Sequence, residues 1–131
     1  MPQIVPKPWG EEQIILSRPF TIKKAITHAK SRWSLQYHDQ KSEILILLSG
    51  QATITLGPDQ KNLTTISMVK YRPYLIKKTT VHRFAAISNC TTLELSPGEP
   101  GTTFRLADDY QRSNETEKLR NLPLRGWQKK T

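Results

Sequence analysis

The sequence is poor in cysteine, in long hydrophobic runs and in acidic residues. Cys90 is the one cysteine among 131 residues, which excludes an internal disulfide and a cysteine-based zinc cluster. The chain has no apolar run of about 18 residues, the length that a membrane-spanning helix needs. The first residues, MPQIVPKPWG, contain no apolar signal core. We therefore expect a soluble, cytoplasmic protein.

The apolar content is high enough for a folded core. Hydrophobic residues make up 36% of the chain and charged residues 24%, and three Trp, four Tyr and three Phe are present. This composition excludes intrinsic disorder over most of the length. A length of 131 residues fits one domain with one core.

Positive charge dominates the polar residues. Twenty Lys and Arg against eleven Asp and Glu give a formal net charge of +9, an excess that suits nucleic acid, a membrane surface or an anionic small molecule. The basic residues are spread in pairs such as Lys23-Lys24 and Lys77-Lys78, never in a block of five. No known nucleic-acid-binding motif is present. A phosphorylated metabolite is the partner that we expect, without membrane or nucleic acid.

Gly and Pro interrupt the chain at short intervals, and β-branched residues are dense between them. Residues 52–56 alternate between apolar and threonine side chains, as in a half-buried strand. The segment 44–48 is apolar throughout and predicts a central strand. The predicted strands are 13–16, 20–27, 32–37, 43–49, 51–56, 62–67, 73–77, 80–87 and 91–95. So many short strands indicate an all-β sandwich or small barrel.

The end of the chain has a different pattern. Residues 113–122 (SNETEKLRNL) predict a short helix, with Ser113 or Asn114 as its N-cap and acidic residues in its first turn. A loose basic tail follows. We therefore divide the chain into a β-barrel domain, residues 1–112, and a C-terminal helix and basic tail, residues 113–131.

Four polar residues have the spacing of a metal site. Gln36 and His38 are two residues apart in a predicted strand, so their side chains leave the same face. Glu43 follows after a tight turn, and His82 lies in another predicted strand. One amide oxygen, two imidazoles and one carboxylate form a mixed donor set for a divalent cation. Taken singly, each of these residues is better explained as a strand residue that makes ordinary hydrogen bonds, whereas the four as a set favour metal binding.

The spacing Gln-x-His-x4-Glu, followed by Gly50, resembles the first motif of the cupin superfamily, with Gln36 where many cupins have His. At closer range the chain resembles the cupin domain of type II mannose-6-phosphate isomerases (phosphomannose isomerases). The matching residues are Lys7-Pro8-Trp9-Gly10, Ile22-Lys23, Ser34-Leu35-Gln36-Tyr37-His38, Glu43, Ser49-Gly50, His82-Arg83 and Asp108-Asp109-Tyr110-Gln111-Arg112. The resemblance implies a double-stranded β-helix, the cupin or jelly-roll barrel.

The chain departs from the family pattern around the metal ligands. Lys41 stands where the family has Arg, and a lysine does not reproduce a bidentate guanidinium clamp. Lys30, Thr79 and Gln111 stand at positions where the family has Gly, and Lys77 stands where it has Pro. The proposed ligands are therefore retained better than the residues that surround them.

The resemblance implies a metal-dependent enzyme that interconverts mannose 6-phosphate and fructose 6-phosphate, with Gln36, His38, Glu43 and His82 as metal ligands. Zinc is the expected ion, although this donor set accepts other divalent cations. Lys41 is a candidate general base, because it is next to the site and burial would lower its pKa. The candidate phosphate-binding residues are Lys23, Arg83, Arg105 and Arg112.

Several alternatives stay open. A cupin that binds metal and a sugar or sugar phosphate without catalysis is favoured by Lys41 in place of the motif arginine. Arg83 and Arg112 either bind phosphate or pair with Asp108 and Glu94. The other residues singled out receive plain structural interpretations: Trp9 and Trp33 in the core, His28 on the surface and Cys90 inert in a turn. Cupin barrels expose edge strands, whose pairing between two copies predicts a homodimer.

Overall fold

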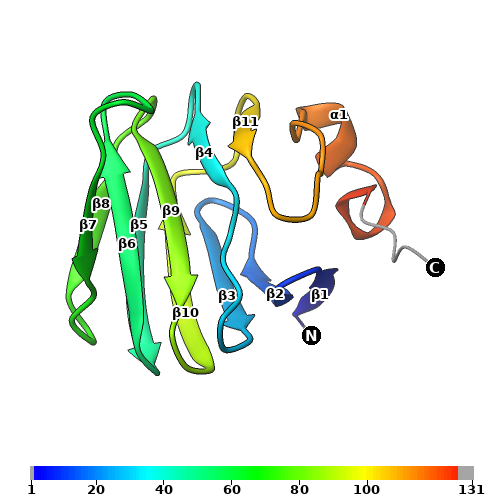
Figure 1. The fold of residues 1–131 in the computed structure, drawn as a ribbon. Helices are drawn as coiled ribbons and strands as arrows, with labels where there is room; N and C mark the ends of the chain where they lie inside the picture. The colour runs from blue at the N-terminus through cyan, green and yellow to red at the C-terminus, as the bar shows by residue number, and fades with distance from the viewer. Residues whose placement is uncertain (1, 127–131) are drawn as a thin grey trace.

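The structure is a computed structural model that describes residues 2–126, and it consists of two antiparallel sheets that face each other (Figure 1). The first sheet has the order β1 (Gln3–Lys7), β2 (Gly10–Leu16), β3 (Thr21–Thr27), β10 (Cys90–Ser96), β5 (Glu43–Ser49) and β8 (Pro73–Ile76). The second has the order β11 (Thr103–Ala107), β4 (Leu35–His38), β9 (Val81–Ala86), β6 (Ala52–Gly57) and β7 (Thr64–Ser67). The expected all-β jelly-roll barrel is confirmed.

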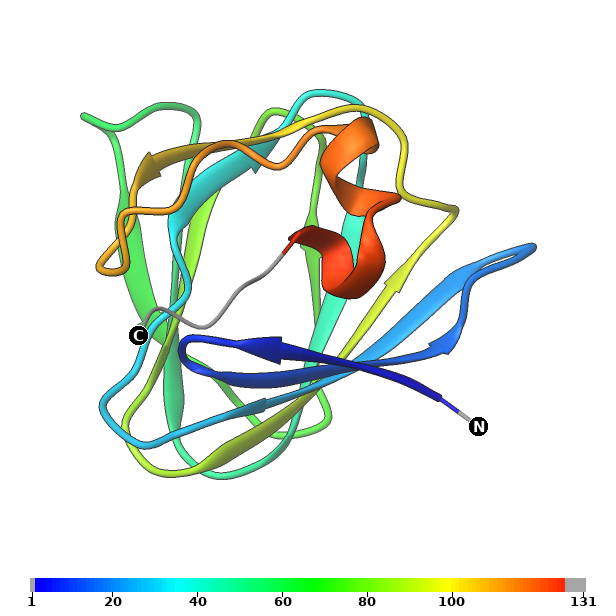
Figure 2. The same ribbon diagram turned by 90° about the vertical axis from the view of Figure 1, so that its right-hand side faces the viewer.

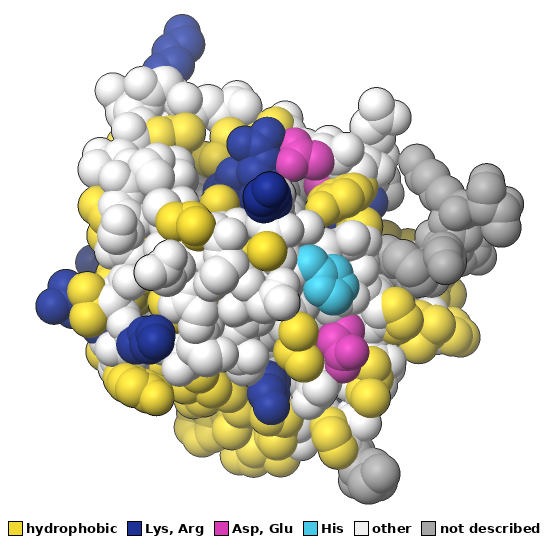
Figure 3. Space-filling model, turned by 60° about the horizontal axis from the view of Figure 1, so that its bottom comes forward, with side chains coloured by type: hydrophobic (Ala, Val, Ile, Leu, Met, Phe, Trp, Pro, Cys, Tyr) yellow, Lys and Arg dark blue, Asp and Glu magenta, His cyan; other side chains and the backbone are white. Residues whose placement is uncertain are grey.

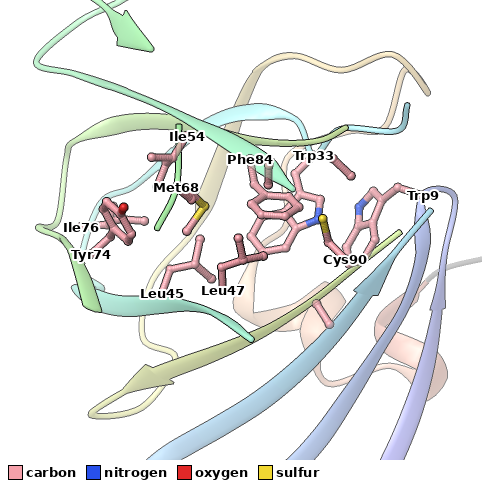
Figure 4. Packing of buried hydrophobic residues seen from close by; sticks show 13 residues of the cluster. Trp9, Trp33, Leu45, Leu47, Ile54, Met68, Tyr74, Ile76, Phe84 and Cys90 are labelled. Atoms are coloured by element: carbon pink, nitrogen blue, oxygen red, sulfur yellow. The ribbon is translucent and has the colours of Figure 1, made fainter. Parts of the chain in front are cut away.

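Apolar side chains from both sheets fill the interior (Figure 4). The ring centroids of Trp9 and Trp33 are 5.3 Å apart, and those of Trp33 and Phe84 are 4.7 Å apart. The rest of the cluster is Ala25, Leu45, Leu47, Ala52, Ile54, Met68, Tyr74, Ile76, Ala86 and Cys90. Both tryptophans also line a polar cavity, so they separate the apolar core from it. The prediction that they are core residues is confirmed.

Two strands, β1 and β11, were not predicted from the sequence, and each lies at an edge of its sheet. Pro6 lies within β1, where an edge strand tolerates its missing N–H group. The strand expected over 32–37 begins only at Leu35, because Arg32 makes an isolated bridge instead. The segment 44–48 lies in β5, which has neighbours on both sides as predicted.

The predicted C-terminal helix is much shorter than expected. α1 spans Glu117–Arg120, and its N-cap is Thr116, whose hydroxyl accepts a hydrogen bond from the N–H of Leu119 at 3.1 Å. The caps proposed from the sequence, Ser113 and Asn114, are wrong. Within residues 2–126, no helix is long and apolar enough to cross a membrane.

The residues before this helix are extended because they bind the barrel. Glu115 forms an isolated bridge with Thr103, and both backbone hydrogen bonds between them are 2.9 Å long. The Asn114 side chain accepts a hydrogen bond from the N–H of Arg105 at 2.9 Å. These long-range contacts outweigh the local helix signal of residues 113–115.

A 3-10 segment, η1 (Pro123–Gly126), follows α1 and lies close to β1 at the open end of the barrel (Figure 2). The Arg125 guanidinium in this segment is ion-paired with Glu99. The interpretation of residues 124–126 as part of a loose tail is therefore wrong. Residues 127–131 of the predicted tail lie outside the described residues.

The three positions where the family that the sequence resembles has Gly have a glycine-like backbone. Lys30, Thr79 and Gln111 have φ angles of 68°, 70° and 56°, in the left-handed region. This conformation is unfavourable for residues with a Cβ, above all for a β-branched one. We expect Thr79→Gly to raise the free energy of unfolding by about 1 kcal/mol, measured by denaturant titration.

The matched control is Thr80→Gly, since Thr80 is not among the residues with positive φ. That change is expected to lower stability through the added entropy of the unfolded chain. Equal destabilisation by both changes would show that the backbone at Thr79 is not strained.

Candidate metal centre

A polar cavity lies between the two sheets, beside the tryptophans of the core. Most of the side chains that line it are charged. The lining residues are Lys7, Trp9, Glu12, Lys23, Trp33, Ser34, Gln36, His38, Lys41, Glu94, Glu99, Thr103, Arg105, Arg112 and Glu115. Buried charges are costly unless they are paired, so this interior is expected to serve binding rather than stability.

Three of the predicted ligands converge beside this cavity, and one of them, His38, lines it. β4, β5 and β9 contribute His38, Glu43 and His82, and all three side chains are buried. Nε2 of His38 lies 3.4 Å from Oε1 of Glu43, and Nε2 of His82 lies 3.3 Å from the same oxygen. The potential ligand atoms all lie within 4.8 Å of one another. This is the spacing of atoms that share one ion.

The Nδ1 atoms of the two histidines make hydrogen bonds, and their Nε2 atoms face Oε1 of Glu43. Nδ1 of His82 lies 2.9 Å from the carbonyl oxygen of Thr80, to which it must donate, since a carbonyl only accepts. Nε2 of His82 therefore faces the Glu43 carboxylate, and this buried nitrogen has no hydrogen-bond partner. Nδ1 of His38 lies 2.9 Å from Thr103 Oγ1, a hydroxyl that either donates to this nitrogen or accepts from it. An imidazole nitrogen and a carboxylate that face each other are both electron-rich, so a cation between them is favourable.

The protonation states also suit a metal. Burial, helped by the nearby Lys41 ammonium, lowers the pKa of His38 to about 4, so this imidazole is neutral at pH 7. Burial alone would raise the pKa of Glu43, but Lys41 and the two histidines outweigh it and hold that pKa well below its ordinary value. The centre thus offers a carboxylate and neutral imidazole at pH 7, which are the protonation states that metal ligands require.

Gln36 stands beside this cluster. It pairs in register with His82 on β9 and with Arg105 on β11, and it precedes His38 by two residues on β4. Directly paired residues and alternate residues of a strand share one face of a sheet. Gln36 is therefore on the face that carries both histidines, and it lines the cavity.

Lys41 and Lys23 are both held by carboxylates. Nζ of Lys41 lies 3.1 Å from Oε2 of Glu43 and 3.3 Å from Oε2 of Glu94. Nζ of Lys23 lies 3.0 Å from both Glu94 and Glu99. Burial alone would lower the pKa of Lys41, but the carboxylates outweigh it and raise that pKa. The expected lowering at Lys41 is therefore wrong, because the sequence did not reveal its partners.

The remaining phosphate-binding candidates lie in different places. Arg105 and Arg112 line the cavity, whereas Arg83 is not among its lining residues. Arg83 follows His82 on β9 and so lies on the other face of that strand. There it donates to the carbonyl oxygens of Trp33 and Ala107 at 2.8 and 3.0 Å.

Arg112 makes the ion pair that the sequence left as an alternative. Its Nε lies 2.8 Å from Oδ2 of Asp108. Arg105 is less completely paired, because its buried Nε has no hydrogen-bond partner. Burial, together with the nearby Arg112, lowers the pKa of Arg105. Two neighbouring guanidiniums thus line this cavity together with several carboxylates.

Sequence reasoning missed Glu94 as a cavity residue. Thr92, Glu94 and Ser96 alternate along β10, and Thr92 and Ser96 are buried, so the period of two could have placed Glu94 inside. Burial and the nearby Glu43 raise the pKa of Glu94. The cavity therefore holds a carboxylate that is not a predicted metal ligand and that favours its protonated form more than an exposed glutamate does.

The C-terminal segment closes this cavity on one side, which the sequence did not suggest. Nε of Arg120 lies 3.0 Å from Oε1 of Glu115, and its Nη1 donates to the carbonyl oxygen of Glu99 at 2.6 Å. The Lys7 and Lys23 ammonium groups outweigh the effect of burial and lower the pKa of Glu115 to about 2. Glu99 and Glu115 thus join the segment after residue 112 to the barrel.

Comparison with known proteins agrees with the fold and gives the family. The family model described as "Mannose-6-phosphate isomerase C-terminal" matches residues 1–114. No curated protein matches the sequence. Three similar solved structures share the fold at 14% identity or less, and this chain spans about a third of the length of each.

The capsular polysaccharide assembling protein CapF from Staphylococcus aureus has a TM-score of 0.64 and 10% identity, over 87% of this chain and 31% of CapF. A mutant of oxalate decarboxylase OxdC from Bacillus subtilis has a TM-score of 0.68 and 14% identity, over 80% and 30%. Vicilin from hazelnut, Corylus avellana, has a TM-score of 0.61 and 12% identity, over 74% and 31%. With a cupin barrel, a His/Glu/His cluster and a family match over residues 1–114, the chain belongs to the family of the mannose-6-phosphate isomerase C-terminal domain.

Proposed function

We propose that this protein is a metal-dependent sugar-phosphate isomerase that interconverts mannose 6-phosphate and fructose 6-phosphate. The observation that carries the proposal is the convergence of His38, Glu43 and His82 beside a cavity that His38 lines together with a carboxylate outside the ligand set, Glu94. Metal binding alone needs only the cluster of His38, Glu43 and His82. A reaction that moves a proton between two carbons also needs a base such as the Glu94 carboxylate.

The three clustered residues together with Gln36 would hold the ion, with zinc as the expected occupant. A divalent cation bound there supplies Lewis acidity toward the substrate's oxygens. The protein's own contribution is to orient the two rings through their Nδ1 atoms, that of His82 on the carbonyl oxygen of Thr80 and that of His38 on the hydroxyl of Thr103.

Glu94 is the general base in this proposal, in place of Lys41. Nζ of Lys41 lies 3.1 Å from Oε2 of Glu43 and 3.3 Å from Oε2 of Glu94. The ammonium group of Lys41 therefore lies between the proposed base and a proposed metal ligand. Burial raises the pKa of Glu94 toward the range in which a carboxylate both takes and returns a proton near neutral pH. Glu94 takes the proton from C2 of the aldose and returns it to C1, while a hydroxyl proton passes from O2 to O1.

Arg105 and Arg112 are the proposed phosphate ligands. Both line the cavity, and the unpartnered Nε of Arg105 is available to an anion. Lys23 is surrounded by carboxylates, which favours a role in holding Glu94 and Glu99 over contact with phosphate. Arg83 is directed to backbone carbonyls outside the cavity lining, so we leave it out of this site.

Glu94→Gln tests the proposal, because it keeps the size of the side chain and removes the base. We expect kcat for mannose 6-phosphate isomerisation in a coupled assay to fall by at least about 100-fold. The metal content is expected to stay unchanged.

Glu11→Gln, on the outer face of β2, is the matched control and is expected to keep full activity. Full activity of the Glu94 variant would contradict the assignment of the base. Stoichiometric metal without turnover in the unaltered protein would instead favour the non-catalytic cupin, which Lys41 in the place of the motif arginine also favours.

A further inference from the structure

Residues 116–126 form a compact unit, which we call the C-terminal unit. The N–H of Leu122 donates to the carbonyl oxygen of Leu119 at 3.1 Å, and the N–H of Arg125 donates to that of Leu122 at 2.9 Å. Gly126 approaches Leu119 so closely that a side chain on this glycine would overlap the leucine. These internal contacts allow the unit to move as one body.

The C-terminal unit lies at the open end of the barrel (Figure 2). No residue of α1 or η1 is buried, and Leu122 and Leu124 are 47% and 42% exposed. The match to the family model ends at residue 114, before the unit begins. The unit is therefore an addition to the family domain and contributes little to the apolar core.

Polar contacts, most of them with a charged partner, hold the C-terminal unit to the barrel. Nη1 of Arg125 lies 2.9 Å from Oε2 of Glu99, and Nη1 of Arg120 donates to the carbonyl oxygen of Glu99 at 2.6 Å. The N–H of Gly101 donates to Oε1 of Glu117 at 2.6 Å. On the face of the molecule shown in Figure 3, by contrast, Lys and Arg side chains lie scattered among uncharged ones. A dense set of ion pairs is thus a local feature of the barrel's open end.

The carboxylates beside the C-terminal unit each have a second cationic partner in the barrel. Nζ of Lys23 lies 3.0 Å from Glu99 and 3.6 Å from Glu12. Glu115 lies 3.5 Å from Nη2 of Arg105. A buried charge is costly when it is left without a partner. If the unit moved away, its arginines would enter water and these carboxylates would keep their barrel partners, so the movement avoids that cost.

The backbone provides a fixed point on one side of the C-terminal unit and strain within it. Both backbone hydrogen bonds between Glu115 and Thr103 are 2.9 Å long, so the chain is tied to the barrel up to Glu115. Leu124 and Arg125 have φ angles of 52° and 56°, which are unfavourable for residues with a Cβ. Such a conformation persists only where surrounding contacts hold it. Loss of those contacts would release the unit from Thr116 onward.

The cavity is too small for a sugar phosphate while the C-terminal unit is in place. Its volume is about 60 Å³. This is room for about five water molecules, since one water needs roughly 10–15 Å³, and a hexose phosphate has far more non-hydrogen atoms. Three residues of the cavity wall, Glu12, Glu99 and Glu115, lie within 4.0 Å of the Arg125 guanidinium. The wall at this point is therefore backed by a unit that can move.

We propose that the C-terminal unit is a lid, hinged after Glu115 and latched by the ion pair between Arg125 and Glu99, which opens to admit a sugar-sized anion to the cavity. In its closed position the unit shields the cavity from solvent, as lids over reaction sites do. The proposal is independent of the isomerase activity, because any ligand of this size meets the same wall.

Hydrogen exchange of single amides, followed by NMR on the full chain, tests the hinge. The N–H of Gly101 donates to Glu117 in the C-terminal unit, whereas the N–H of Thr103 donates to Glu115 before the hinge. In Arg125→Gln we expect exchange at Gly101 to become at least about 10-fold faster, because a charged hydrogen bond of the closed state is lost, and exchange at Thr103 to stay unchanged. Equal acceleration at both amides, or none at Gly101, would overturn the proposal.

Thiol labelling tests whether the C-terminal unit controls entry to the cavity. Ser34 lines the cavity and is 1% exposed, so Ser34→Cys places a thiol inside it. We expect labelling of this thiol by iodoacetamide, a neutral reagent, to become at least about 10-fold faster when Arg125→Gln is added. Arg72→Gln, on the exposed loop before β8, is the matched control and is expected to change nothing. Cys90 serves as an internal reference, because it lies in the core and not in the cavity lining. The same labelling rate with and without the change at Arg125 would show that ligands reach the cavity by another way and would overturn the proposal.

Discussion

His82→Ala is expected to lower the affinity for a divalent cation by more than about 100-fold, because changes to residues that merely support a ligand already cost about 10- to 100-fold. The change removes the one imidazole whose Nε2 is buried, without a hydrogen-bond partner, and 3.3 Å from Oε1 of Glu43. Isothermal titration with zinc measures the affinity directly.

His28→Ala is the matched control. His28 is exposed and lies outside the cluster, so its loss is expected to leave zinc affinity unchanged. Unchanged zinc binding by the His82 variant would mean that the ion sits elsewhere.

Lys23→Met is expected to cost about 3–5 kcal/mol of the free energy of unfolding, the range found when one partner of a buried ion pair is removed. The methionine keeps the length of the side chain but leaves Glu94 and Glu99 without the ammonium that lies 3.0 Å from each. Glu12 loses the same partner at 3.6 Å. Denaturant titration at pH 7 measures the loss.

Lys70→Met separates this effect from the general loss of a positive charge. Lys70 is exposed, and exposed substitutions usually change stability by no more than about 0.5 kcal/mol. If Lys23→Met behaved like this control, the carboxylates around Lys23 would not need its charge.

The fold and the His/Glu/His cluster could be predicted from the sequence, because the strands that carry them have a clear period-two pattern. The period-two spacing of Gln36 and His38 places both on one face of a strand, whatever the rest of the chain does. The motif spacing then added Glu43 and His82, and the structure brings these two within 3.3 Å of each other. A site whose residues lie within short motifs is well suited to sequence reasoning.

The rest of the cavity depends on contacts between distant parts of the chain. Glu99 and Arg125 are 26 residues apart, yet they form an ion pair, and no local pattern indicates it. The helix expected over residues 113–122 failed for the same reason, since Glu115 bridges to Thr103 on another strand. Arg83 was misplaced for a simpler reason: it neighbours a ligand in sequence and therefore points to the opposite face of β9.

The most direct test of the central claim is a coupled assay of mannose 6-phosphate isomerisation, run on the zinc-loaded chain and on the same sample after chelation. We expect turnover that is lost on chelation and restored when zinc is added back. Stoichiometric zinc with no turnover in either sample would contradict it.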